Sequence, residues 1–142
     1  LLHAAACGAT AITILGALGG RWDHTLANVA LLALPELRGC HTRLLADRQT
    51  LFLVRDAAPI EGQAGDTVSL LPLTAEARGV TTRGLLYPLA DATLRYEQAR
   101  GVSNVLIETP GHVSLESGLL LVVHHDDGGA HQFYAGEAPI KT

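Results

Sequence analysis

The chain lacks the features that mark membrane and secreted proteins. No apolar run reaches the roughly 20 residues that cross a bilayer, because Gly8, Gly16, Gly19 and Gly20 interrupt the apolar opening stretch. That stretch also has no Lys or Arg at its start, as a signal peptide would. Methionine is absent altogether. We therefore expect no membrane partner and no secretory signal.

Positive charge and cysteine are also scarce. The 10 Lys and Arg are outnumbered by 14 Asp and Glu, which gives a formal net charge of −4, and they form no cluster. Because nucleic-acid binding depends on cations placed against phosphates, we expect no nucleic-acid partner. Cys7 and Cys40 lie far apart without metal-ligand spacing. This usage is typical of free thiols, and it disfavours a disulfide between the two cysteines. Free thiols are typical of a reducing compartment, so we expect the protein in the cytoplasm.

Aliphatic side chains are abundant, and their spacing changes near Gly39. Residues 11–15 form a continuous, largely β-branched run that is typical of a strand in a parallel sheet. Leu26 and Val29 belong to a stripe with helical spacing that follows this strand. We therefore predict helix, strand and helix over residues 1–38. A single parallel strand needs neighbours, so this segment is half of an α/β unit.

Beyond Gly39, short apolar runs alternate with turn residues, which is typical of antiparallel sheets. We predict about eight strands packed as an antiparallel β-sandwich over residues 39–125. Residues 126–142 carry few apolar side chains and are predicted to form a loop or weakly ordered tail. The runs that predict strands cover residues 43–48, 50–56, 66–74, 79–89, 92–98, 103–108, 112–117 and 119–125.

The most informative segment is the GGRWDH loop of residues 19–24, which separates the predicted strand from the predicted helix. The carboxyl end of such a strand is where α/β folds bind ligands. Gly19 and Gly20 let a phosphate approach the backbone, and Arg21 is able to grip its oxygens beside the free N–H groups of the helix start. The simpler interpretation is a tight turn in which Asp23 caps the helix and Arg21 is solvated.

Two other polar groups have residue types that bind metals. His24 and Asn28 share a helix face, but no third ligand lies at useful spacing, so a packed or solvated face is favoured. His124 and His125 precede two aspartates. Adjacent residues of a strand point to opposite faces, so we interpret this cluster as a charged strand end.

Hydroxyl, amide and aromatic groups recur in the second half of the chain. Thr82 and Tyr87 lie in one predicted strand, and Ser103 and Asn104 open another. Such groups bind flat heterocycles by stacking and hydrogen bonding. Composition alone favours a structural interpretation, because Thr and Tyr are strand formers and Ser-Asn is a common turn pair.

Five consecutive segments resemble thiamine pyrophosphokinase in order, spacing and content: ITILGALGGRWDHTLANVALL, GDTVSLLPL, GVTTRGLLYPLADATL, RGVSNVLI and VSLESGLLLVV. The match covers nearly the whole chain up to about Val123. The resemblance implies transfer of the pyrophosphoryl group of ATP to thiamine with Mg²⁺, giving thiamine diphosphate and AMP. It also implies a homodimer with active sites between subunits, in which an α/β nucleotide-binding domain precedes a thiamine-binding β-sandwich. Residues 1–38 would be the remnant of the first domain and residues 39–125 the second.

By the same resemblance, Arg21 and Asp23 are catalytic residues near the ATP phosphates and magnesium. Gly19 and Gly20 line the phosphate site with Arg21, and Asp23 is a candidate metal ligand. Trp22 occupies a position that varies in the family and receives no role. We expect the Arg21 guanidinium to be exposed at the mouth of a cleft and free to meet an anion.

The resemblance assigns the Ser103–Asn104 pair to the thiamine pocket, with Tyr87 stacking on the ring and Thr82 as a weaker neighbour. We expect Ser103, Asn104 and Tyr87 to converge on one concavity at the dimer seam. The apolar runs at residues 68–73 and 119–123 offer more apolar surface than one small sandwich needs, so we expect dimerisation largely through the β domain.

The family also has an acidic motif of closely spaced aspartates that holds magnesium and ATP, and nothing before Ala11 supplies it. Phosphoryl transfer depends on metal ions that neutralise developing charge. We therefore expect an enzyme as the parent protein and no activity from this chain alone. Two alternatives stay open: a non-catalytic thiamine-binding or dimerisation module, and a β-sandwich of unrelated function attached to part of an α/β fold.

Overall fold

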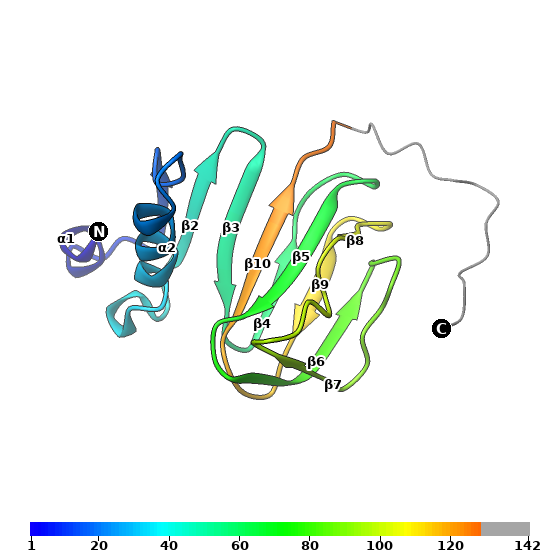
Figure 1. Ribbon diagram of the computed structural model, residues 1–142. Helices are drawn as coiled ribbons and strands as arrows, with labels where there is room; N and C mark the ends of the chain where they lie inside the picture. Colours follow the sequence, from blue (N-terminus) through cyan, green and yellow to red (C-terminus); the bar gives the residue numbers. More distant parts are fainter. Residues whose placement is uncertain (129–142) are drawn as a thin grey trace.

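The computed structural model describes residues 1–128. The first part contains the helix α1 (Leu2–Ala6), the strand β1 (Ala11–Leu15), the helix α2 (Trp22–Leu31) and the short 3-10 helix η1 (Pro35–Leu37), as the apolar spacing predicts. Everything that follows within the described residues is strand or loop (Figure 1). None of the helices in this part of the chain is long and apolar enough to cross a membrane.

The strands form two sheets. The larger sheet has six strands in the order β1-β2-β3-β10-β5-β8, and the smaller has four in the order β4-β9-β6-β7. Within residues 1–128, only β1 and β2 pair in parallel, and the other strand pairs are antiparallel. The strands after η1 are β2 (His41–Ala46), β3 (Gln49–Val54), β4 (Ala57–Ile60), β5 (Thr67–Pro72), β6 (Glu76–Arg83), β7 (Ala92–Arg95), β8 (Asn104–Val105), β9 (Gly111–Ser114) and β10 (Leu120–His125).

The main core lies between the two sheets and takes side chains from both. Alternation along β10 shows how: Leu120 and Val122 face this core, whereas Leu121 and Val123 face the opposite side of the sheet. Burying such side chains stabilises the fold by roughly 1.5–3 kcal/mol each. The fully buried members of this core include Val54, Ile60, Val68, Leu70, Val80, Leu94, Leu106, Val113, Leu120 and Val122.

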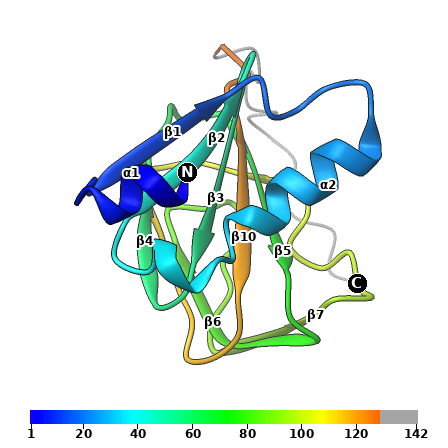
Figure 2. The ribbon, with the colours of Figure 1, turned by 90° about the vertical axis from the view of Figure 1, so that its left-hand side faces the viewer.

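A second apolar cluster lies on the outer face of the large sheet, where α2 covers part of it (Figure 2). Leu32, Leu51 and Leu121 are buried there, and Val29 of α2 packs against them. The outward-facing side chains of the run at residues 119–123 are therefore partly covered by the chain itself.

Strand β4 was not predicted from the sequence. It contains Pro59, which has no N–H to donate to a sheet ladder. The structure accommodates Pro59 because β4 is an edge strand of the small sheet, with Pro59 opposite His112 of β9. An edge strand tolerates such a proline because the side without a partner needs no N–H donor.

The predicted run at residues 79–89 is interrupted. Strand β6 ends at Arg83, and Gly84 follows with φ +72°, close against the backbone carbonyl of Glu108. A side chain at Gly84 would be strained by this dihedral and crowded by that carbonyl. Beyond it, Leu85 forms only an isolated bridge to Leu106. Residues 84–89 therefore form a separate segment beside β8.

The boundary predicted at residues 38/39 lies inside the large sheet, because β1 pairs with β2 across it. The division of the chain into two domains at this point stays a prediction. Of the tail predicted over residues 126–142, the part from residue 129 onward lies outside the described residues.

Candidate functional site

The glycine-rich loop between β1 and α2 lines an open cavity of about 270 Å³. Side chains of α2 hold the loop in place: the Asn28 amide donates to the Ala17 carbonyl at 2.8 Å, and the Thr25 hydroxyl bonds both polar backbone groups of Gly19 at 3.3 Å. Arg21 and His24 also line the cavity. The loop thus presents glycine backbone and one arginine to a small polar space, which suits an anion.

Arg21 is exposed beside this cavity, as expected, but the expectation that its guanidinium is free is wrong. Nη2 lies 2.6 Å from Oδ2 of Asp23, and Nε donates to Oδ1 at 3.2 Å. The cause is local: Arg21 is the residue before the first turn of α2, and Asp23 lies within that turn. This hydrogen bond is also the main reason why the pKa of Asp23 lies below its usual range. Exposed ion pairs of this kind are weak, so an anion can compete for Arg21.

Two of the candidate metal ligands beside the glycine-rich loop already have partners within the chain. Asp23 is paired with Arg21. Within residues 1–128, no three His, Cys, Asp or Glu side chains gather closely enough to hold a metal ion. The amide N–H of Asn28, which shares a helix face with His24, donates to the Ala17 carbonyl of the loop.

The two adjacent histidines at the end of β10 point to opposite faces, as predicted. His124 Nε2 lies 2.8 Å from Oδ2 of the buried Asp66, whereas His125 lines a groove on the outer face. Asp66 also accepts hydrogen bonds from the backbone N–H groups of Gln63, at 2.7 Å, and Asp127, at 3.1 Å. The cluster therefore fastens the loop before β5 to the end of β10.

The Ser-Asn pair at the start of β8 serves two different purposes. Asn104 is only 5% exposed, and its amide hydrogen-bonds to the backbone of Tyr87. Ser103 is exposed, with φ +59°, and its N–H donates to the Ser69 hydroxyl at 3.0 Å. A non-glycine residue with such a dihedral is uncommon and directs attention to function.

Tyr87 and Thr82 differ in the same way. The Tyr87 residue is 58% exposed, whereas Thr82 is buried and its hydroxyl accepts a hydrogen bond from the Leu89 N–H at 2.8 Å. Ser103 and Tyr87 therefore present groups to solvent, and Asn104 and Thr82 do not. None of the four lines either of the two cavities described in this subsection.

Exposed apolar side chains surround Tyr87 on two neighbouring segments. The Leu86 N–H donates to the Val105 carbonyl at 2.9 Å, and the Ile107 N–H donates to the Gly84 carbonyl at 2.8 Å. Leu86 and Ile107 are themselves exposed. We call this surface, formed by residues 84–87 and 102–107, the Tyr87 surface.

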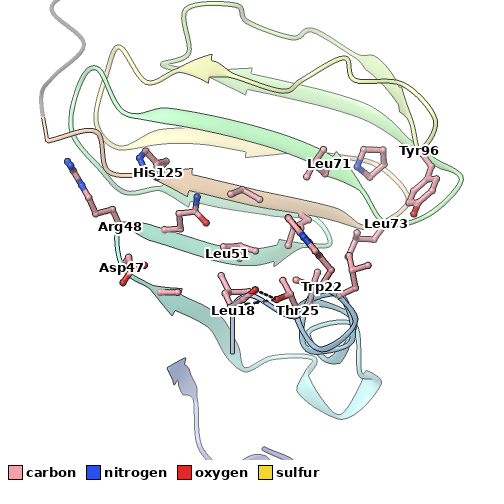
Figure 3. Close-up of a pocket in the computed structure, with 18 residues that line it drawn as sticks. Leu18, Trp22, Thr25, Asp47, Arg48, Leu51, Leu71, Leu73, Tyr96 and His125 are labelled. Carbon is pink, nitrogen blue, oxygen red and sulfur yellow. Dashed lines mark hydrogen bonds between the residues drawn. The ribbon is translucent and has the colours of Figure 1, made fainter. Parts of the chain in front are cut away.

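A larger groove was not anticipated from the sequence. It has a volume of about 770 Å³ and lies between α2 and the outer face of the large sheet (Figure 3). This volume is within the range of about 300–1,000 Å³ that is typical of ligand pockets. Trp22, 76% exposed, and Tyr96 lie along it. Trp22, Leu26 and Val29 have the spacing of one helix face, and all three line the groove. This spacing is the sequence signal that could have predicted their common location.

Comparison with known proteins identifies the class of domain. Residues 58–120 match the family described as thiamin pyrophosphokinase, vitamin B1 binding domain. This range includes Thr82, Tyr87, Ser103 and Asn104. The matched range covers most of the residues from β4 to β10.

The chain is also similar to parts of whole proteins. Thiamine pyrophosphokinase 1 of Oryza sativa subsp. japonica is 27% identical over 117 residues, covering 79% of this chain and 44% of its own. Thiamine pyrophosphokinase of Bacillus subtilis (strain 168) is 27% identical over 122 residues, covering 82% and 55%. The crystal structure of thiamine pyrophosphokinase from Bacillus subtilis matches with a TM-score of 0.80 and 26% identity, over 88% of this chain and 59% of that one.

These findings confirm the resemblance seen in the sequence: the chain matches the C-terminal portion of thiamine pyrophosphokinases, including the thiamine-binding β domain. It spans about half the length of the curated relatives that it matches.

Proposed function

We propose that this chain is the thiamine-binding portion of a thiamine pyrophosphokinase. The parent enzyme transfers the pyrophosphoryl group of ATP to thiamine with Mg²⁺ and forms thiamine diphosphate and AMP. The observation that carries the proposal is the match of residues 58–120 to the vitamin B1 binding domain, because these residues also form most of the exposed Tyr87 surface. Tyr87 supplies a stacking face and Ser103 a hydroxyl, the kinds of group that a flat heterocycle needs.

In this proposal residues 1–38 are the remnant of the α/β nucleotide-binding domain, and residues 39–125 are the antiparallel β-sandwich. The edge position of β1 supports this division, since a parallel strand requires neighbours and covering helices. The loop at residues 19–24 then faces the ATP phosphates. Arg21 exchanges Asp23 for a phosphate when the nucleotide binds, and the released Asp23 becomes available to the metal.

These 142 residues are not proposed to catalyse the transfer on their own. The closely spaced aspartates of the family are absent before β1, and the described residues offer no group of three metal ligands. Without the further carboxylates of that acidic motif to hold the metal, the charge that develops on the phosphates is not neutralised. We place the parent enzyme in the cytoplasm, which agrees with the two free cysteines.

Thiamine binding is tested by replacing Ser103. Ser103→Ala is expected to weaken thiamine binding at least tenfold, because a polar group of the ligand loses its partner, which costs on the order of 1–3 kcal/mol. Calorimetric titration of thiamine into both proteins measures the change. Ser103→Gly is the matched control: it also removes the hydroxyl but tolerates the positive φ. Equal affinity in wild type and both variants would remove Ser103 from the site.

A homodimer is the proposed assembly, with the Tyr87 surface at its seam. A second copy would cover the exposed apolar side chains of this surface. The thiamine site would then lie between the two subunits. Sedimentation velocity at micromolar concentration is expected to show a dimer, and Leu86→Glu is expected to shift it to monomer. Trp22→Glu serves as the control, because Trp22 is also exposed but lies on α2, away from the Tyr87 surface. A wild-type protein that stays monomeric would contradict the proposal.

A further inference from the structure

Asn104 pairs with the backbone of Tyr87 in the way that a neighbouring strand would. Its Nδ2 donates to the Tyr87 carbonyl at 2.7 Å, and its Oδ1 accepts from the Tyr87 N–H at 3.0 Å. Oδ1 also accepts from the N–H of Val105 at 2.9 Å. A carbonyl oxygen has two lone pairs, so both are occupied. Asn104 has no acceptor left for a ligand, and its side chain is buried.

The local sequence explains why a side chain has to do this. Tyr87 is followed by Pro88, which has no N–H, and Gly84 bends the chain away from β6. An ordinary sheet ladder cannot continue through this segment. The side chains of Asn and Gln end in an amide, which donates through its N–H and accepts through its carbonyl oxygen as a peptide group does. The amide of Asn104 therefore replaces the missing strand partner.

Thr82 fastens the other end of the same segment. Its hydroxyl accepts from the Leu89 N–H at 2.8 Å, and its backbone N–H donates to the Leu89 carbonyl at 2.9 Å. Residues 84–89 are thus held by β6 on one side and by β8 on the other. Tyr87 is the residue that Asn104 of β8 holds, and its side chain is exposed.

We propose that Asn104 is a positioning residue that acts through Tyr87: it holds the Tyr87 backbone so that the ring is presented to thiamine, and it does not itself contact the ligand. Thr82 supports the same segment. The part of this proposal that concerns thiamine rests on the proposed function, whereas the clamp on residues 84–89 stands on the hydrogen bonds alone.

Amide hydrogen exchange tests the clamp without any ligand. Asn104→Asp replaces the Nδ2 donor with a carboxylate oxygen, which repels the Tyr87 carbonyl that Nδ2 holds. The segment around Tyr87 is expected to move away from residue 104, so the protection of the Tyr87 N–H is expected to fall at least tenfold. Protection in β10, for example at Val122, is expected to stay unchanged, which shows that the loss is local. Unchanged protection at Tyr87 would overturn the proposal.

A pair of variants at Thr82 tests the same segment if Asn104→Asp fails to fold. Thr82→Val has the shape of threonine but cannot accept the Leu89 N–H, so protection at Leu89 is expected to fall at least tenfold. Thr82→Ser retains the hydroxyl and is expected to restore protection to within about threefold of wild type. Equal exchange in the two variants would contradict the role of the hydroxyl.

A double-mutant cycle shows whether Asn104 acts through Tyr87. Calorimetry with thiamine is expected to give about tenfold losses for Tyr87→Ala and for Asn104→Asp, and no further loss when the two are combined. Additive losses of about a hundredfold would overturn the proposal, because they would mean that Asn104 contacts thiamine itself. If wild type does not bind thiamine, the proposed function and this ligand-positioning role both fail, and the exchange results show whether the clamp exists independently.

Discussion

Asp66→Ala is expected to lower the free energy of unfolding by about 3–5 kcal/mol, the usual result of removing one partner of a buried pair. Asp66 is 1% exposed and accepts hydrogen bonds from two backbone N–H groups. Its removal leaves those donors, and the ring of His124, without their acceptor. Each buried group left unsatisfied adds to the cost. Because this cluster joins the loop before β5 to the end of β10, the loss affects the large sheet.

Urea denaturation monitored by circular dichroism measures the change. Glu76→Ala is the matched control, since the Glu76 carboxylate also pairs with a side chain, that of Arg78, but Arg78 is largely exposed. Screening by solvent makes such a pair weak, and only a small change is expected. A loss for Asp66→Ala no larger than that of Glu76→Ala would show that the cluster contributes little to stability.

The same carboxylate predicts a pH dependence of stability. Burial pushes the pKa of Asp66 upward, but hydrogen bonds from Gln63, His124 and Asp127 outweigh it and leave the pKa below its usual range. The ionised form is therefore favoured in the folded state. Its contribution is fully present above the unfolded pKa of about 3.9 and is lost as the pH falls through the lower folded value.

Asp66→Asn cannot ionise, so its unfolding free energy is expected to fall less steeply than that of wild type below about pH 4. Asp23 and Glu76 also have lowered pKa values and will keep part of the slope in the variant. Urea titrations at several pH values provide the comparison. Identical slopes in the two proteins would show that Asp66 does not carry the acid sensitivity.

Arg21→Ala is expected to reduce kcat about 10²–10³-fold in a parent enzyme that carries this chain together with the acidic motif, as loss of one charge-stabilising donor commonly does. Thiamine affinity is expected to change less than twofold, because the loop at residues 19–24 and the Tyr87 surface lie on different elements. Steady-state kinetics of AMP formation separates the two effects.

Arg21→Lys is the matched variant. Lysine keeps the charge but not the planar fork that grips two phosphate oxygens, so partial recovery of kcat is expected. Asp23→Ala would at the same time free Arg21 and remove a candidate metal ligand, so it does not serve as a control. An Arg21→Ala enzyme with normal kcat and weakened thiamine binding would contradict the phosphate role.

Local patterns were sufficient to predict the elements and their faces. The change of spacing near Gly39 predicted helix, strand and helix followed by strands, and period-two alternation placed His124 and His125 on opposite faces. These features depend on the geometry of a few consecutive residues, which is the same in any protein. Strand β4 was missed because proline argues against a strand until the edge position of that strand is known.

The partners of the polar side chains were decided only by the tertiary structure. Asn104 bonds to a residue 17 positions away, and His124 to one 58 positions away. Nothing in the local sequence indicates that the amide of Asn104 is used inside the protein while the neighbouring Ser103 faces solvent. Strand order and register determine which distant backbone group meets a buried amide, and a buried polar group takes the partner that packing brings within reach. The different environments of Ser103 and Asn104 therefore depended on the packing of β5, β6 and β8 around residues 84–89.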